Sequence, residues 1–325
     1  MANILVVGGA GYVGGALTDL LAKTDHKVRV YDSLVYEESY RKPVDFILGD
    51  VRDWGRLDPH LKWADAVVWI AALVGDGACS VDPKLTEEIN NHSVRELSKR
   101  FGGRILFTST CSVYGAQDGL LHEGSPLNPL SLYAQTKTEA EKHLVDKNAI
   151  VFRLGTLFGV GDHFSRIRLD LVVNVLTVKA CLYNRISVFG GAQYRPLLHV
   201  RDVAEAVVQN LETKHAGVYN LHTVNVRITD LADMFLKHFP GIEVQRTEVK
   251  FQDSRNYRVT SEKAEKTFGF TPKWGLEEGM LELKSIVESD RIKNVAIPRH
   301  SNHRFLKEIL DRPVSPLGYE APTDI

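Results

Sequence analysis

The stretch Ile4-Leu5-Val6-Val7-Gly8-Gly9-Ala10-Gly11-Tyr12-Val13-Gly14 joins a run of branched apolar residues to a glycine-rich segment, and a helical apolar pattern follows from residue 16 to 21. This order predicts a strand, a tight turn and a helix. Glycines there let backbone N–H groups approach a pyrophosphate at the helix N-terminus, where a Cβ would block the approach. Asp32 follows eighteen residues after Gly14. This context favours dinucleotide binding over a glycine-rich surface turn.

Asp32 closes the second predicted strand, and its carboxylate can accept hydrogen bonds from ribose hydroxyls while repelling a 2′-phosphate. Ser33 and Leu34 bring no cation for such a phosphate, so the cofactor is predicted to be NAD rather than NADP. The alternative is an ordinary aspartate in a strand-end turn. We expect the cofactor to contact the glycine-rich turn and the ends of the next strands, namely Gly8, Gly11, Tyr12, Val13, Gly14, Asp32, Asp50, Val51, Ala71, Ala72 and Leu73.

The bulk composition of the 325-residue chain, 44% hydrophobic and 25% charged, is that of a soluble globular protein. Its 40 basic and 41 acidic residues leave a net charge of -1, which gives no reason to expect nucleic-acid or membrane partners. The absence of a long apolar run or a leader pattern predicts a cytoplasmic protein. The three cysteines, Cys79, Cys111 and Cys181, fit neither a disulfide framework nor a zinc site, so no metal is expected.

Short apolar runs alternate with helical patterns through the first half of the chain, which predicts an α/β fold with a doubly wound, Rossmann-type parallel sheet. Strands are expected at 3–7, 27–31, 45–49, 66–70, 103–109 and 149–153, with helices at 12–23, 53–61, 84–101 and 132–147. Beyond residue 155 we expect helices at 166–180, 200–213, 228–239, 260–267 and 276–288, and strands at 186–189 and 217–221. The tail from Pro298 onward, rich in Pro, His and Arg, is assigned to no element.

Tyr133 and Lys137 lie four residues apart in a predicted helix and therefore share one face. A phenol is a poor base at neutral pH, but an ammonium and a positive nicotinamide ring both lower its pKa. The pair could then take a proton from a sugar hydroxyl. Of the eleven tyrosines only Tyr133 has a lysine at this spacing. The alternative is a pair with a purely structural role.

Hydroxyl residues also mark the end of the fifth predicted strand, Thr108-Ser109-Thr110-Cys111-Ser112-Val113-Tyr114-Gly115. A hydroxyl there could bond the reacting oxygen and share its proton with Tyr133. An ordinary strand-end turn explains these small residues equally well, and both interpretations stay open.

Together these motifs resemble the extended short-chain dehydrogenase/reductase family, in its NAD-dependent nucleotide-sugar epimerase/dehydratase branch. The resemblance runs over nearly the whole chain. Besides the glycine turn and the Tyr133 pair, it includes Gly49-Asp50-Val51, the segment around Asn90, and Thr110-x-x-Val113-Tyr114-Gly115. It continues through 153–159, 195–203 and Tyr219-Asn220-Leu221.

The resemblance implies two lobes: residues 1–160 would bind NAD, with 196–222 returning to that lobe, and the smaller mixed α/β lobe, mainly 161–325, would bind a nucleoside diphosphate sugar. It further implies a catalytic triad of Thr110, Tyr133 and Lys137, and Asn90 beside the cofactor. Expected substrate contacts are Val74, Cys111, Ser112, Asn174, Arg195, Arg255 and Arg258. Surface salt bridging is the alternative for the last two. The family implies a homodimer built through the helices 84–101 and 132–147.

Two departures from the family pattern narrow the reaction. Members that catalyse 4,6-dehydration carry Asp and Glu directly after the triad threonine, where this chain has Cys111 and Ser112. A neutral serine cannot replace a carboxylic acid as proton donor, so 4,6-dehydration is disfavoured. A cysteine packed at a strand end is more often inert than acidic. Thr156 stands where the family commonly carries an asparagine that contacts substrate.

A narrower similarity links 72–76, 168–174 and 255–259 to a branch of epimerases and oxidoreductases, some resembling dehydrogenases that oxidise C4 of a GDP-heptose. The leading prediction is an NAD-dependent epimerase that works by hydride transfer at C4 through a 4-keto sugar. The alternative is a net C4 dehydrogenase or 4-keto reductase with the same triad. A third hypothesis, a dinucleotide-binding regulator without activity, is opposed by the intact Thr110, Tyr133 and Lys137.

Overall fold

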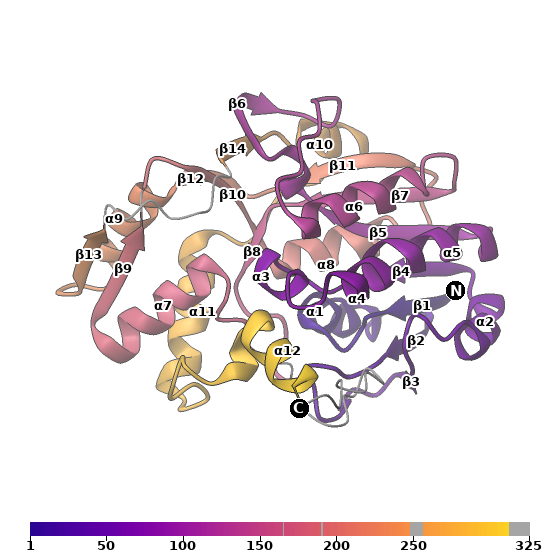
Figure 1. Cartoon of the computed structure of the whole chain (residues 1–325), viewed down its shortest axis with the longest axis horizontal. Coiled ribbons are helices and arrows are strands. Elements are labelled where there is room, and N and C mark those ends of the chain that lie inside the picture. The colour runs from indigo at the N-terminus through magenta and orange to yellow at the C-terminus, as the bar shows by residue number, and fades with distance from the viewer. Residues whose placement is uncertain (165, 190, 248–255, 312–325) are drawn as a thin grey trace, which may run out of the picture.

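The computed structural model describes residues 1–164, 166–189, 191–247 and 256–311. Within these residues a seven-stranded parallel sheet forms the larger lobe, in the order β11-β7-β5-β4-β1-β2-β3 (Figure 1). Its strands are β1 (Asn3–Val7), β2 (Lys27–Asp32), β3 (Asp45–Leu48), β4 (Ala66–Trp69), β5 (Arg104–Thr110), β7 (Ala149–Leu154) and β11 (Gly217–Leu221). The predicted Rossmann-type sheet is confirmed, and β11 joins it late from the second half of the chain.

Both faces of the sheet are covered, because β1 is apolar from Ile4 to Val7. Ile4 and Val6 of β1 pack with α1 (Tyr12–Leu21), α8 (Val200–Gln209) and α10 (Glu262–Phe268). Leu5 and Val7 point the other way, as successive strand residues must. On that face lie α2 (Trp54–Trp63), α4 (Pro83–Glu87), η1 (Glu88–His92), α5 (Ser93–Arg100), α6 (Leu132–Lys142) and α12 (Asn302–Leu310).

The strand order reverses at β1, which has β2 on one side and β4 on the other. Connections leave the carboxyl ends of these strands in opposite directions, and a crevice opens between them. The glycine-rich turn follows β1 at this point, and the short helix α3 (Asp76–Cys79) follows β4. The topology thus brings the residues after β1, β2, β4 and β5 to one edge of the sheet.

The smaller lobe packs around Phe158, Leu176, Phe235 and Met280. Its helices are α7 (Val172–Tyr183), α9 (Ile228–His238) and α11 (Leu276–Glu288). One sheet has the order β12 (Val224–Arg227), β10 (Tyr194–His199), β8 (Thr156–Phe158), with β10 in the middle. A second sheet pairs β13 (Glu243–Thr247) with β9 (Arg185–Phe189). In Figure 1 this lobe extends to the left of the parallel sheet. A third small sheet pairs β14 (Asn256–Val259) with β6 (Ala116–Leu121) and packs against η2 (Cys111–Tyr114).

Three segments differ from the sequence-based expectations. The helix expected at 166–180 begins only at Val172, and residues 166–171 form no helix. The tail from Pro298 onward, assigned to no element, forms η3 (Pro298–His300) and α12. The helix expected at 84–101 is divided into α4, η1 and α5. Among the described helices, none combines the length and the apolar character needed to cross a bilayer.

Candidate active site

The glycine-rich turn packs so tightly that side chains are excluded from it. Gly8 has φ +91°, and a Cβ there would overlap the backbone of Ala71 at the end of β4. A Cβ on Gly14 would lie 2.5 Å from the Cα of Gly9. The turn places the N-terminus of α1 at the sheet edge. The N-cap residue of α1 is Gly11, which has no side chain to bond the first helical amides. The first amides of α1 are therefore available to an anion at the positive end of the helix dipole.

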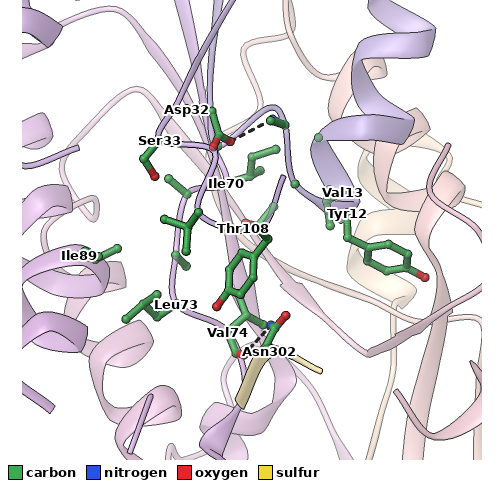
Figure 2. Close-up of a pocket in the computed structure, with 18 of the residues that line it drawn as sticks. Tyr12, Val13, Asp32, Ser33, Ile70, Leu73, Val74, Ile89, Thr108 and Asn302 are labelled. Atoms are coloured by element: carbon green, nitrogen blue, oxygen red, sulfur yellow. Dashed lines mark hydrogen bonds between the residues drawn. The ribbon is translucent and has the colours of Figure 1, made fainter. Parts of the chain in front are cut away.

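A pocket runs from this turn along the carboxyl edge of the sheet to α6 (Figure 2). Of the predicted cofactor residues, all except Asn90 line this pocket: Gly8, Gly11, Tyr12, Val13, Gly14, Asp32, Asp50, Val51, Ala71, Ala72, Leu73, Tyr133 and Lys137. Figure 2 shows Asp32 and Ser33 at one end and Val74 with Asn302 at the other. The strand ends therefore line a single elongated groove.

Asp32 ties the glycine-rich turn to the end of β2. Its Oδ2 accepts from the Ala10 amide at 3.0 Å and its Oδ1 from the Leu34 amide at 2.8 Å. Burial raises the pKa of the Asp32 carboxyl, and the amide hydrogen bonds oppose that rise. The carboxylate lies where ribose hydroxyls would meet an acceptor.

Asp50 reaches the pocket from the end of β3, but its carboxylate is held by a neighbour. Its oxygens accept from the Arg52 side chain at 2.8 and 2.9 Å, and Arg52 also pairs with Glu88 at 3.1 Å. The Tyr31 hydroxyl donates to the Asp50 carbonyl at 2.9 Å. The side chain thus fixes the loop, while Asp50 and Val51 contribute to the pocket wall.

The predicted proton-transfer pair lies on one face of α6, as its spacing requires. Lys137 is 2% exposed, and its Nζ donates to the Thr108 carbonyl at 2.8 Å and lies 4.4 Å from the Phe107 ring centroid. The Thr110 hydroxyl is close enough to Tyr133 to lower the pKa of the phenol, and it accepts from the Ser112 amide at 3.1 Å. Tyr133 and Lys137 therefore line one end of the pocket, with Thr110 of β5 beside Tyr133.

The electrostatics of this triad differ from the expectation. Burial raises the pKa of Tyr133, and only the Arg168 charge and the Thr110 hydrogen bond among its main influences lower it. Burial lowers the pKa of Lys137 to about 8, near neutrality. Burial therefore dominates the phenol pKa, and Lys137, which was predicted to lower that pKa, is not among its main influences. With the chain's own groups, Tyr133 is a neutral phenol at pH 7, and a positive nicotinamide ring is needed to favour the phenolate.

A buried ion pair fixes α6 against the sheet. Arg153 of β7 binds Glu141 of α6 with its Nη2 at 2.6 Å and its Nε at 3.1 Å, and Ser109 of β5 also donates to Glu141. Neither charged side chain is more than 7% exposed. This pair sets the position of Lys137, one turn earlier on the same helix, and of Tyr133, two turns earlier, relative to β5.

Cys111 and Ser112, the two departures from the dehydratase pattern, lie directly after Thr110. The Cys111 thiol is fully buried and donates to the Arg153 carbonyl at 3.2 Å, and burial raises its pKa. This is the packed thiol expected from the sequence. The Ser112 hydroxyl lies 3.3 Å from the Tyr257 hydroxyl of β14. No carboxylic acid occupies either position.

The arginines predicted to bind substrate gather around Tyr194 at the start of β10. Arg195 is 5% exposed and donates from Nη1 to the Tyr194 carbonyl at 2.8 Å. The exposed Arg258 places its guanidinium 5.0 Å from the Tyr194 ring centroid. Arg255 lies outside the described residues. Of the other predicted substrate residues, Val74 lines the pocket.

Two predicted contacts are instead structural. Asn90 is 1% exposed, and its amide accepts from the Leu73 N–H at 2.8 Å and donates to the Leu73 carbonyl at 2.9 Å. Asn174 is fully buried and makes the corresponding pair with Gly159, at 3.0 and 3.3 Å, and a third bond to the Arg168 carbonyl. A side-chain amide can satisfy a backbone donor and acceptor together. Both asparagines therefore hold loops beside the site and do not line the pocket.

Sequence reasoning missed Arg166, Arg168 and Asn302, which all line the pocket. A signal was present in the sequence: polar residues at 166, 168 and 170 alternate with apolar residues at 167, 169 and 171, and the apolar ones are buried. Such alternation indicates an extended segment rather than a helix. For Asn302 the signal was Ser301, a residue type that favours the N-cap of a helix. In the structure Ser301 caps α12 and accepts from the Arg304 amide.

The geometry defines a dinucleotide-binding α/β protein of the Rossmann type with a Tyr–Lys pair at the far end of its cofactor groove. Residues 4–222 match the model of the NAD dependent epimerase/dehydratase family, and the chain belongs to that family. It is therefore an enzyme, and its cofactor is NAD.

Similar proteins cover nearly the whole chain. A UDP-glucose 4-epimerase of Rhizobium meliloti is 29% identical over 310 residues, 84% of this chain and 93% of the relative. UDP-glucuronic acid decarboxylase 3 of Arabidopsis thaliana is 26% identical over 318 residues, 92% of this chain and 91% of the relative. The solved structure of MoeE5 in complex with UDP-glucose and NAD superposes with a TM-score of 0.76 at 24% identity, over 89% of this chain and 100% of that one. The reaction thus differs among the relatives.

Proposed function

We propose that this enzyme is a nucleoside diphosphate sugar epimerase that acts at C4 of the sugar through a 4-keto intermediate. The observation that carries the proposal is the convergence of Thr110, Tyr133 and Lys137 at one end of the NAD groove. The similarity to the UDP-glucose 4-epimerase of Rhizobium meliloti supports a nucleotide-sugar substrate.

In the proposed mechanism, the bound NAD supplies a reversible two-electron oxidation at C4. Tyr133 accepts the proton of the 4-hydroxyl, and Thr110, whose hydroxyl lowers the pKa of Tyr133, would bridge that proton. Lys137 is fixed by the Thr108 carbonyl, so its charge lies beside the groove throughout. After the keto sugar has rotated in the site, Tyr133 returns the same proton to the C4 oxygen, which completes the other epimer.

The second candidate is a net C4 dehydrogenase or 4-keto reductase, which needs the same triad and differs only in releasing the keto sugar. The decarboxylases among the relatives support only that the reaction varies within this family. A 4,6-dehydratase is disfavoured because Cys111 is a buried thiol with a raised pKa and Ser112 is neutral. A non-enzymatic regulator is excluded by membership of an enzyme family.

The substrate's diphosphate is proposed to bind near Arg195 and Arg258, because a guanidinium can grip two phosphate oxygens. We further propose that the enzyme works in the cytoplasm as a homodimer, through the helices α5 and α6. The exposed side chains on these helices include Arg95, Lys99 and Lys142, so such an interface would be polar.

The test combines purified protein, excess NAD and a panel of nucleoside diphosphate hexoses and heptoses. Reduced-nicotinamide absorbance, product mass and product stereochemistry are followed together. An epimerase yields a new stereoisomer of unchanged mass without accumulating NADH. Accumulating NADH with a product lighter by two hydrogens overturns the epimerase proposal in favour of the dehydrogenase.

A further inference from the structure

The groove described above has a second wall, made by two segments from the C-terminal half of the chain. One is the extended segment 166–171, and the other comprises η3 and α12 (Figure 1). Among the hydrogen bonds that join them, one runs from the Leu169 amide to the His300 carbonyl at 2.7 Å and one between His300 Nδ1 and the Ile167 carbonyl at 3.0 Å. We name these two segments the clasp.

The clasp is anchored to the sheet lobe on both sides of the groove. On the β4 side, Asn302 donates to the Val74 carbonyl at 2.8 Å, as the dashed line in Figure 2 shows, and Leu306 is buried in the core beside α3. On the β2 side, the Arg166 amide donates to Glu37 at 2.8 Å, and its guanidinium lies 4.2 Å from the Tyr36 ring centroid. The clasp therefore spans the groove from its β2 side to its β4 side.

One carboxylate couples the two segments of the clasp. Asp170 accepts from Arg168 Nε at 3.0 Å with one oxygen and from the Asn302 amide at 2.9 Å with the other. Arg166 also donates to the Asn302 side-chain oxygen. The segment 166–171 and the first turn of α12 are therefore tied together by these bonds.

The groove face of the clasp carries two arginines. Arg168 is paired with Asp170, but the guanidinium of Arg166 donates only to the Arg299 carbonyl and the Asn302 amide oxygen among its described hydrogen bonds, both of them neutral. Burial and the neighbouring Arg168 lower the pKa of Arg166 to about 10. An anion in the groove would relieve both effects.

The two arginines lie between the two ends of the groove. Arg166 stacks on Tyr36, just after β2, where the adenosine ribose is expected beside Asp32. Arg168 lies 5.9 Å from the Tyr12 ring centroid at the start of α1, and its charge acts on Tyr133 at the other end. The part of a dinucleotide between its two ribosides is the diphosphate, which carries two negative charges.

We infer that Arg166 and Arg168 form the second half of the diphosphate site, facing the N-terminus of α1, and that Asn302 latches this half over the bound NAD. The inference rests on the cofactor site of the proposed function and not on which sugar reaction follows. A latched cofactor leaves slowly. Slow release suits a reaction cycle in which NAD is regenerated within each turnover, whereas a net dehydrogenase must exchange its cofactor every time.

The test measures nucleotide binding without any sugar. Arg166→Met and Asn302→Ala are compared with wild type and with Arg304→Met, a matched arginine variant on the exposed face of α12. Dissociation of bound NADH is followed by fluorescence after chasing with excess NAD, and ADP and adenosine affinities are measured by calorimetry. Melting without nucleotide checks that each variant is folded.

We expect both clasp variants to release NADH at least about tenfold faster, the effect of losing one charge-assisted bond, and Arg304→Met to match wild type. Arg166→Met should also weaken ADP binding about tenfold while leaving adenosine binding unchanged. Unchanged NADH release in both variants overturns the inference. Equal losses for ADP and adenosine in Arg166→Met overturn the diphosphate assignment. Because no sugar is present, neither result depends on the epimerase proposal.

Discussion

Burial shifts the two reactive groups of this enzyme in directions that matter for its chemistry. The Tyr133 phenol has a raised pKa and the Lys137 ammonium a lowered one, both because their charged forms lose contact with water. Burial therefore favours the neutral form of both groups. A positive charge beside the phenol, such as an oxidised nicotinamide ring would supply, favours the phenolate.

Replacing Tyr133 by Phe removes only the hydroxyl that receives the substrate proton. Turnover should fall at least about 100-fold, the contribution of a positioned general base. Steady-state rates on the sugar identified in the panel provide the measurement, with NAD affinity expected to stay within twofold or so of wild type. Tyr183→Phe, on an exposed tyrosine of α7, is the control. Near-normal turnover in Tyr133→Phe would falsify the assignment.

Lys137→Met tests the burial of the ammonium through stability. The folded-state pKa of about 8 lies below the ordinary 10.5, so between these pH values the unfolded chain binds more protons and wild-type stability rises with pH. Lys137→Met should lack this rise. The measurement is the difference in urea unfolding free energy between the two proteins across that window. A difference that does not change with pH would show that Lys137 is not desolvated as described.

At the scale of elements, single buried amides decide where strand ends and loops lie. Asn90 projects from η1 and binds both backbone groups of Leu73, so η1 fixes the segment after β4 that lines the groove. Asn174 does the same for the loop at Gly159 from α7. The groove is thus shaped by side chains that do not reach it.

Asn90→Ala should destabilise the fold by about 2 kcal/mol or more, because it leaves a buried donor and a buried acceptor unpaired. Its neighbour Asn91, half-buried and bonded to Glu87 and His143, is the matched control, with an expected loss of about 0.5 kcal/mol. Chemical denaturation supplies both values. NAD binding should weaken in Asn90→Ala as well. Equal losses in the two variants would argue against a special role for Asn90.

The whole molecule depends on contacts between distant parts of the chain, of which the clasp is the clearest. The Asp170 carboxylate binds both Arg168 and the backbone amide of Asn302, which are far apart in sequence. Burial opposes its charged form, but the Arg168 charge and the hydrogen bonds from Arg168 and the Asn302 amide hold its pKa below the usual value.

Because the folded-state pKa of Asp170 is lowered, its contribution to stability is complete above the ordinary value of 3.8 and is lost as pH falls through the folded value. The difference in unfolding free energy between wild type and Asp170→Asn should therefore be constant from neutral pH down to about 3.8 and shrink below it. Urea titrations at a series of pH values measure this difference. A difference that grows on acidification would contradict the pairing.

The proposed dimer makes a prediction at the same scale. An interface through α5 and α6 would include the exposed Arg95, Lys99 and Lys142. Salt screens charges across such a surface, with a Debye length of about 3 Å at 1 M. The same helices carry the acidic Glu96 and Glu139, so the surface holds charges of both signs that can attract across the interface. Sedimentation should therefore show a dimer at low salt that weakens at high salt. A monomer at low salt, or a dimer that is indifferent to salt, would rule out this interface.

The sequence by itself determined the parallel sheet, the glycine-rich turn and the Tyr133–Lys137 pair. Each of these depends on neighbours within a few residues, where apolar periodicity, the steric freedom of glycine and helical spacing act directly. For the same reason the helix at 276–288 was predicted with its observed bounds.

Only the tertiary structure decided the second wall of the groove, the structural roles of Asn90 and Asn174, and the direction of the Tyr133 pKa shift. Asn302 meets Val74 across 228 positions of sequence, a distance over which local patterns carry no information. Burial likewise belongs to the packed molecule, because the loss of hydration around a phenol depends on every element that surrounds it. Local sequence determined the helices and strands, and tertiary packing determined which of their side chains line the cofactor groove.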